Sequence, residues 1–202
     1  MVTNIDLALY AEHAAFWSVF GLTRLILHSR NRDGTGRPAQ AAMSRQNTIA
    51  PFSRTLLAFH MLAFAVMYFG VGNAVLPRRV PIWFSGQRVV GSMVIASGAG
   101  LVAWALVGFR SWRFRAKLEE GHQLATEGPF RILRHPIYTG LNLLALGTAL
   151  WVPTTIVWVA FVLMAIGSDL RARAEEALLE RAFGLPYRQY QARTRRFVPY
   201  IY

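Results

Sequence analysis

The hydrophobic positions of this chain gather into long blocks instead of the short alternating runs of a soluble domain. Apolar stretches of about 20 residues, enough for a helix to cross a hydrocarbon layer of about 30 Å, run from about Ile5 to Leu27, Thr55 to Leu76 and Val89 to Phe109. A fourth block, Ile137 to Gly167, is longer than one span and is interrupted at Trp151–Thr154, where a proline favours a turn. We therefore predict an all-α integral membrane protein with about five transmembrane helices, the last two forming a helical hairpin.

Composition and charge agree with a membrane protein. Of the 202 residues 54% are hydrophobic and 16% are charged, and a soluble domain of this size would expose too much apolar surface. The formal net charge of +12 does not indicate nucleic-acid binding, because the basic residues lie between and after the apolar blocks. Arginines and lysines concentrate in the first loop, in 110–136 and in the C-terminal tail, whereas the second loop holds only Arg78, Arg79 and Arg88. The positive-inside rule then puts these three basic segments in the cytoplasm and the N-terminus outside.

The beginning of the chain does not have the pattern of a cleaved signal peptide. Asp6 and Glu12 lie there and no basic residue precedes the apolar stretch, so we expect the first span to be retained. The chain has no cysteine, which removes disulfides, thiolate nucleophiles and cysteine-ligated metals. The excess of arginine over lysine fits a GC-rich genome, and we expect the inner membrane of a prokaryote.

A motif with polar chemistry, Gly128–Gly140, lies directly before the fourth apolar block. Pro136 suits the first turn of a helix, which holds His135 just outside the helix start. Unpaired amides at such a start, together with Arg134 and His135, could bind a carboxylate or another anion at the membrane surface. An interfacial loop whose arginine and histidine meet lipid phosphates is the plainer interpretation of the motif alone.

A second polar cluster follows the last apolar block. The segment Ser168–Leu179 has a helical pattern and brings Glu175 and Glu176 to the predicted cytoplasmic end, with Arg171 one turn before Glu175 and able to pair with it. A solvated helix face is the simpler account of two adjacent glutamates taken alone. Beyond a turn near Gly184, two tyrosines are spaced to share a helix face.

Taken together, these motifs resemble the integral-membrane methyltransferases that include isoprenylcysteine carboxyl methyltransferase and the phospholipid N-methyltransferases. The resemblance covers roughly the C-terminal half, so we expect residues 111–202 to form the methyltransferase core and 1–110 to form three divergent helices on the substrate side. The positions that carry the resemblance are His122, Leu124, Thr126, Gly128, Pro129, Arg134, His135, Pro136, Tyr138, Gly140, Arg171, Glu175, Glu176, Leu179, Phe183, Gly184, Tyr187, Tyr190, Phe197 and Pro199.

The resemblance implies S-adenosylmethionine as methyl donor, with S-adenosylhomocysteine as product, bound on the cytoplasmic side under a helical C-terminal tail. Tyr187 and Tyr190 would offer ring faces to the adenine or to the sulfonium cation. The residues expected to bind the cofactor are His122, Leu124, Thr126, Gly128, His135, Pro136, Tyr138, Gly140, Tyr187 and Tyr190.

Methyl transfer needs the acceptor, the methyl carbon and the sulfur in line, so positioning and exclusion of water can supply much of the catalysis. For a carboxylate acceptor we expect Arg134 to orient the oxygens, with Arg171 as second choice. For an amine or hydroxyl acceptor a proton must leave, and Glu175 or Glu176 would be the base. By the resemblance a lipophilic carboxylate of isoprenylcysteine type is our first expectation; an amine headgroup and a small thiol stay open.

A sterol-type reductase that uses a nicotinamide dinucleotide, or a non-catalytic membrane protein of the same architecture, is the alternative to methyl transfer. The five histidines show no metal-ligand spacing. His13 and His60 lie inside predicted spans, where each either is satisfied by a neighbouring helix or contacts substrate. Oligomeric state is not predicted.

Overall fold

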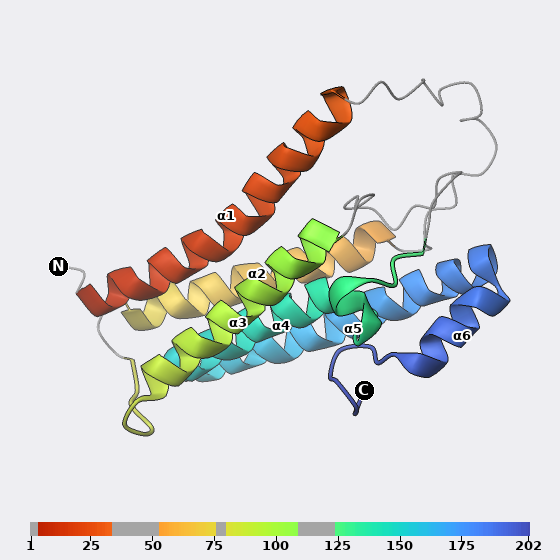
Figure 1. Cartoon of the computed structure of the whole chain (residues 1–202). Helices are drawn as coiled ribbons and strands as arrows, with labels where there is room; N and C mark the ends of the chain where they lie inside the picture. The colour runs from red at the N-terminus through yellow and green to blue at the C-terminus, as the bar shows by residue number, and fades with distance from the viewer. Residues whose placement is uncertain (1–3, 34–52, 76–79, 109–123) are drawn as a thin grey trace.

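The structure is a computed structural model that describes residues 4–33, 53–75, 80–108 and 124–202. Within these residues the fold is all-helical and has no strand, only a single isolated bridge (Figure 1). The elements are α1 (Asn4–Asp33), α2 (Ser53–Val75), α3 (Gln87–Gly108), the 3-10 helix η1 (Gly128–Arg131), α4 (Pro136–Trp151), α5 (Thr155–Phe183) and α6 (Leu185–Arg193).

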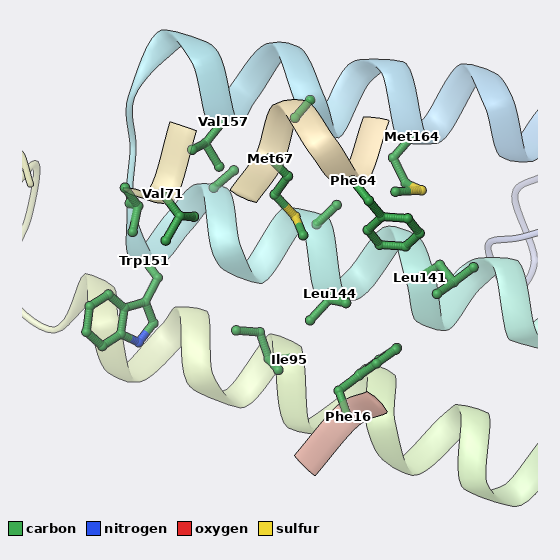
Figure 2. Packing of buried hydrophobic residues seen from close by; sticks show 14 of the residues in the cluster. Phe16, Phe64, Met67, Val71, Ile95, Leu141, Leu144, Trp151, Val157 and Met164 are labelled. Carbon is green, nitrogen blue, oxygen red and sulfur yellow. The ribbon is translucent and has the colours of Figure 1, made fainter. Parts of the chain in front are cut away.

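Helices α2 to α5 run side by side, and α1 leans away from them toward its C-terminal end (Figure 1). The main packing partners are α3 with α4 and α2 with α5, while α1 packs chiefly against α3. Their buried faces form one apolar core, to which α1 contributes Phe16, α2 Met67, α3 Ile95, α4 Leu144 and α5 Met164 (Figure 2). The bundle thus has a continuous interior and leaves apolar side chains on its outside.

Three helices of the described residues are long and apolar enough to cross a membrane: α2 over Arg54–Val75, α3 over Gln87–Val107, and α5 over Thr155–Phe183. Their outer faces carry exposed apolar residues such as Met93, which is 64% exposed, as lipid-facing surfaces do. Helix α4 has 16 residues and is therefore about 24 Å long. The chain is an integral membrane protein, and the count of five spans stays a prediction.

The predicted helical hairpin is confirmed. Helix α4 ends at Trp151, and α5 begins at Thr155 after Thr154, whose side chain accepts a hydrogen bond from the backbone N–H of Val157 (3.4 Å). Helix α5 then runs past the predicted end of the apolar block without a break, as far as Phe183. Gly184, with φ 57°, ends it and lets α6 turn away.

Glycines set the spacing between α3 and α4. A Cβ at Gly98 would lie 2.8 Å from the carbonyl oxygen of Gly140, and one at Gly91 would lie 2.7 Å from the carbonyl oxygen of Gly147. The backbones therefore touch at two levels, as small residues allow in membrane helices. Gly91 and Gly98 thus allow close packing against α4, whereas Gly100 faces open space.

Gly98→Ala is expected to destabilise the bundle, because the new methyl group meets backbone that cannot move aside. Overpacking of this kind costs about 1–3 kcal/mol. Gly100→Ala, two residues along the same helix, is the matched control and should leave the melting temperature unchanged or raise it. Thermal denaturation of both variants in one detergent measures the difference, and equal melting temperatures would contradict the close contact.

Candidate active site

The polar residues of the two predicted clusters meet at one end of the bundle, where α2 begins, α3 ends, α4 begins and the polar part of α5 lies. His135 is the N-cap residue of α4 and Pro136 its first helical residue, as predicted. Gly128 begins η1 with φ 60°, and a Cβ there would lie 3.3 Å from the indole Nε1 of Trp104 in α3. Leu124 and Thr126 precede η1, and His122 lies outside the described residues.

Glu176 is the centre of a buried ion-pair network that we call the Glu176 cluster, made of Glu176, Arg134, His135 and Arg196. Arg134 Nε donates to Glu176 Oε1 at 2.8 Å, and His135 Nε2 lies 3.3 Å from the same oxygen. Arg196 donates through Nε to Oε1 (3.1 Å) and through Nη2 to Oε2 (2.7 Å). The Glu176 side chain is 7% exposed. Both of its carboxylate oxygens are engaged by these neighbours, so Glu176 holds the three side chains together.

The C-terminal tail pairs with the motif through backbone hydrogen bonds. The Arg134 N–H donates to the Arg195 carbonyl (2.7 Å), the His135 N–H to the Arg196 carbonyl (3.2 Å), and the Arg195 N–H to the Ile132 carbonyl (2.9 Å). This is the isolated parallel bridge of the fold. The Arg134 guanidinium also donates through Nη1 to the Thr194 carbonyl at 2.6 Å. Arg134 is therefore occupied on both the Glu176 side and the tail side.

Arg196 extends the same network outward, and the sequence analysis did not place it in the site. Its Nη1 donates to Asp169 Oδ1 (2.9 Å) and to the hydroxyl of Tyr202 (2.6 Å), and that hydroxyl in turn donates to Asp169 (2.8 Å). The hydrogen bonds to Glu176 raise the pKa of Arg196, which stays a cation. No spacing rule links an arginine in the tail to a carboxylate 20 or more residues earlier, so no sequence signal could have paired them.

Glu175 lies beside a second, less saturated group. Its Oε1 accepts a short hydrogen bond from the Tyr138 hydroxyl (2.5 Å) and lies 3.7 Å from Nη2 of Arg171, the predicted ion pair. Its Oε2 lies 3.6 Å from His135 Nδ1. The Arg171 guanidinium lies over the Tyr138 ring at 5.4 Å from the centroid. Glu175 is 23% exposed, so it is the more accessible of the two adjacent glutamates.

The two arginines predicted to orient an acceptor thus differ in what they hold. Arg134 makes short hydrogen bonds to Glu176 and to the tail. Arg171 has 11% of its side chain exposed; it lies 3.7 Å from Glu175, covers the Tyr138 ring and interacts with the Tyr138 hydroxyl. A guanidinium has five donors, and a group this buried normally has its donors satisfied. Among the described residues, Arg171 therefore has fewer of its donors engaged than Arg134.

The two tyrosines of α6 do share one face, with ring centroids 6.0 Å apart, but that face packs against protein. Tyr190 donates to the carbonyl of Phe130 (2.8 Å), which fixes α6 to η1. Tyr187 is fully buried, and its hydroxyl has no hydrogen-bond partner among the residues that the structure describes. Burial raises the pKa of both phenols. Gly140, also predicted to line the cofactor site, faces α3 instead, with Val102 and the Gly98 carbonyl against it.

An all-helical bundle with lipid-facing sides and a charged cluster at one end defines a membrane-embedded protein with a polar site at its surface. The part of the chain that the structure describes holds no group of three or more acidic or histidine side chains able to bind a metal. The phospholipid methyltransferase family model matches residues 87–185, from the start of α3 to the start of α6.

Relatives with assigned names agree with that match. A probable protein-S-isoprenylcysteine O-methyltransferase of Oryza sativa subsp. indica is 27% identical over 197 residues, which cover 95% of this chain and 99% of the relative. Protein-S-isoprenylcysteine O-methyltransferase B of Arabidopsis thaliana is 33% identical over 88 residues, 43% of this chain and 45% of the relative. The chain belongs to the family of integral-membrane methyltransferases that includes the phospholipid and isoprenylcysteine enzymes.

Proposed function

We propose that this protein transfers a methyl group from S-adenosylmethionine to the carboxylate of a lipophilic acceptor of the prenylated-cysteine type, at the cytoplasmic face of the membrane. The observation that carries the proposal is the setting of Arg171, a largely buried guanidinium whose described neighbours engage only part of its donors, beside an accessible glutamate and a tyrosine ring. The class of acceptor is supplied by the name of the Oryza relative, a probable protein-S-isoprenylcysteine O-methyltransferase that matches 95% of this chain.

The residues at this end of the bundle fit the proposed donor. S-adenosylmethionine carries an ammonium, a carboxylate, ribose hydroxyls and a sulfonium, and the accessible Glu175 offers a carboxylate to the cationic groups. When bound, it supplies a methyl group whose transfer to a carboxylate forms a C–O bond, breaks the C–S bond and releases no proton. Neither glutamate then has to act as a base.

Arg171 has the geometry to orient the acceptor. A guanidinium can hold both oxygens of a carboxylate with two parallel hydrogen bonds, and the Tyr138 ring keeps this one in place by stacking. We assign that task to Arg171 in preference to Arg134, since Arg134 already donates to Glu176 and the tail. Arg134, His135 and Glu176 have the task of holding the motif, α5 and the tail in one arrangement.

The proposed orientation follows from where the basic segments attach. The first loop leads into α2, the segment 110–136 joins α3 to α4, and the tail follows α5, so all three meet the end that holds the site. Their positive charge favours the cytoplasm. We accordingly propose five spans, the N-terminus outside, and a site covered on its cytoplasmic side by α6 and the tail.

The first test is calorimetric titration of the detergent-purified protein with S-adenosylhomocysteine, in parallel with NADPH. We expect micromolar binding of the homocysteine nucleoside and none of NADPH; the reverse result would support a reductase. Labelled S-adenosylmethionine is then offered with an N-acylated S-farnesylcysteine or with vesicles containing phosphatidylethanolamine. Label in a base-labile methyl ester supports the proposal, whereas label on the lipid amine would move the protein to the phospholipid branch of the family.

A further inference from the structure

His60, on the second turn of α2, reaches the site from a part of the chain that the family match does not include. The match begins at residue 87, and α2 precedes it. His60 is 2% exposed, and its ring centroid lies 5.9 Å from that of Tyr138, with the planes inclined by 35°. It therefore contacts the tyrosine whose hydroxyl donates to Glu175.

The His60 ring is held firmly in this place. Its Nδ1 donates to the Leu56 carbonyl one turn earlier (3.2 Å), and its Nε2 is hydrogen-bonded to the Ser168 hydroxyl (3.3 Å), which lies 3.1 Å from the Asn142 side chain. Gly167 lets the ring approach α5, since a Cβ there would lie 3.2 Å from His60 Nδ1. Helices α2, α4 and α5 are thus joined at the level just below the site.

Tyr138 is enclosed by groups on several sides. Its ring is stacked with that of His135 (5.6 Å, 20°), the Arg171 guanidinium lies over it, and His60 lies on the side of α2. Of these neighbours His60 alone comes from outside residues 87–185. Rotation about the Cα–Cβ bond of a tyrosine would swing its hydroxyl away, so neighbours that confine the ring help to keep the hydroxyl on its carboxylate oxygen.

We propose that His60 is a positioning residue of the active site: its ring confines that of Tyr138, so that the Tyr138 hydroxyl keeps Glu175 in place beside Arg171. This inference rests on the methyl transfer proposed above and adds a residue of the N-terminal half to it. Small displacements of positioning groups can lower turnover about 100-fold. His60→Leu is therefore expected to lower kcat by roughly tenfold to 100-fold, with KM for the acceptor changing far less.

His13 provides a matched control in the same bundle. It is 6% exposed, and its two ring nitrogens are hydrogen-bonded to the Tyr68 hydroxyl and to the Thr148 hydroxyl, each at 3.0 Å. Thr148 lies ten residues after Tyr138 on α4, which places His13 about 15 Å from the site along the helix. His13→Leu removes a comparable set of hydrogen bonds and should lower the melting temperature as His60→Leu does, while leaving kcat unchanged.

A double-mutant cycle separates positioning from general stability. If His60 acts through Tyr138, the double variant His60→Leu with Tyr138→Phe should have the kcat of Tyr138→Phe alone, because the hydroxyl being positioned is already gone. His60→Phe keeps a ring but not the hydrogen bonds, and should regain most of the turnover lost in His60→Leu. Three results would each overturn the proposal. They are a kcat of the double variant reduced by the product of the two single losses, a kcat of His60→Phe no higher than that of His60→Leu, and a loss of kcat in His13→Leu equal to that in His60→Leu.

The outcome for His60 is separable from the outcome for the acceptor. A wild type that does not methylate the farnesylated compound would contradict the substrate proposed above. The same proteins are then compared by calorimetric affinity for S-adenosylhomocysteine and by melting temperature. If His60 acts through Tyr138, the double variant should bind S-adenosylhomocysteine as weakly as Tyr138→Phe alone, and His13→Leu should bind it as the wild type does. Losses of affinity that add up independently in the double variant would overturn the role of His60.

Discussion

Glu176→Gln is expected to release the C-terminal tail from the motif and to destabilise the protein strongly. The substitution keeps the volume but removes the charge that Arg134, Arg196 and His135 share. Breaking a buried ion pair leaves uncompensated charge and costs about 3–5 kcal/mol. We therefore expect a melting temperature lower by ~10 °C and loss of turnover, because the motif and the tail would no longer be held together.

Limited digestion with trypsin reports the release of the tail directly. Arg193 and Arg195 have exposed side chains, but in the wild type the backbone at Arg195 is hydrogen-bonded to the motif. Cleavage there should be markedly faster in Glu176→Gln. Glu180→Gln, one turn after Glu176 on α5, is the control, because the ion pair of Glu180 with Arg188 of α6 is largely exposed and contributes about 0–1 kcal/mol. Similar digestion of the two variants would show that Glu176 does not hold the tail.

Arg171→Ala is expected to give the largest loss of activity in a protein that still folds. Removing a donor aimed at the reacting group typically costs about 100- to 1000-fold in kcat. We expect a fall of this size in kcat/KM for the carboxylate acceptor, with a smaller change in affinity for S-adenosylhomocysteine. Arg171→Lys should recover little, because an ammonium cannot present two parallel donors to a carboxylate.

Arg173→Lys is the matched control for Arg171→Lys, because it makes the same substitution on the same helix and keeps the positive charge. Arg173 lies two residues further on α5, is 59% exposed and pairs with Asp169 at the surface, so turnover should be unaffected. Activity is measured with labelled methyl donor at several acceptor concentrations, and calorimetry confirms that the variants still bind the product nucleoside. Equal losses in the Arg171 and Arg173 variants would exclude a specific role for Arg171.

Local sequence patterns predicted the helices well. Proline and turn residues near 151–154 divided one apolar block into α4 and α5, because a proline interrupts a helix wherever tertiary contacts do not compensate. The start of α4 at Pro136 followed from the same chemistry, and the approach of Arg171 to Glu175 followed from helical spacing. Each of these features depends on residues within about one helical turn of each other, so it can be predicted from the local sequence.

The parts of the site that the sequence analysis missed depend on contacts between distant segments. Arg196 joins Glu176 across 20 residues, and the tail pairs with a motif some 60 residues earlier. Neither pairing has a periodic signal, since any of the tail arginines could have filled the place of Arg196. The proposal of Arg171 in place of Arg134 as acceptor ligand likewise rests on the hydrogen bonds that Arg134 makes to the packed tail, which the sequence does not reveal.

The pairing of residues 132–135 with 195–196 also fixes when during synthesis this site can form. The ribosome makes the chain from its N-terminus, so α4 and α5 leave it before the segment that carries Arg196. Until that segment emerges, Glu176 lacks one of its two arginine partners. Tyr202 helps to close the tail, since its backbone oxygen accepts from Phe197 N–H and Val198 N–H. The site is therefore completed only after the helices that carry most of it have been made.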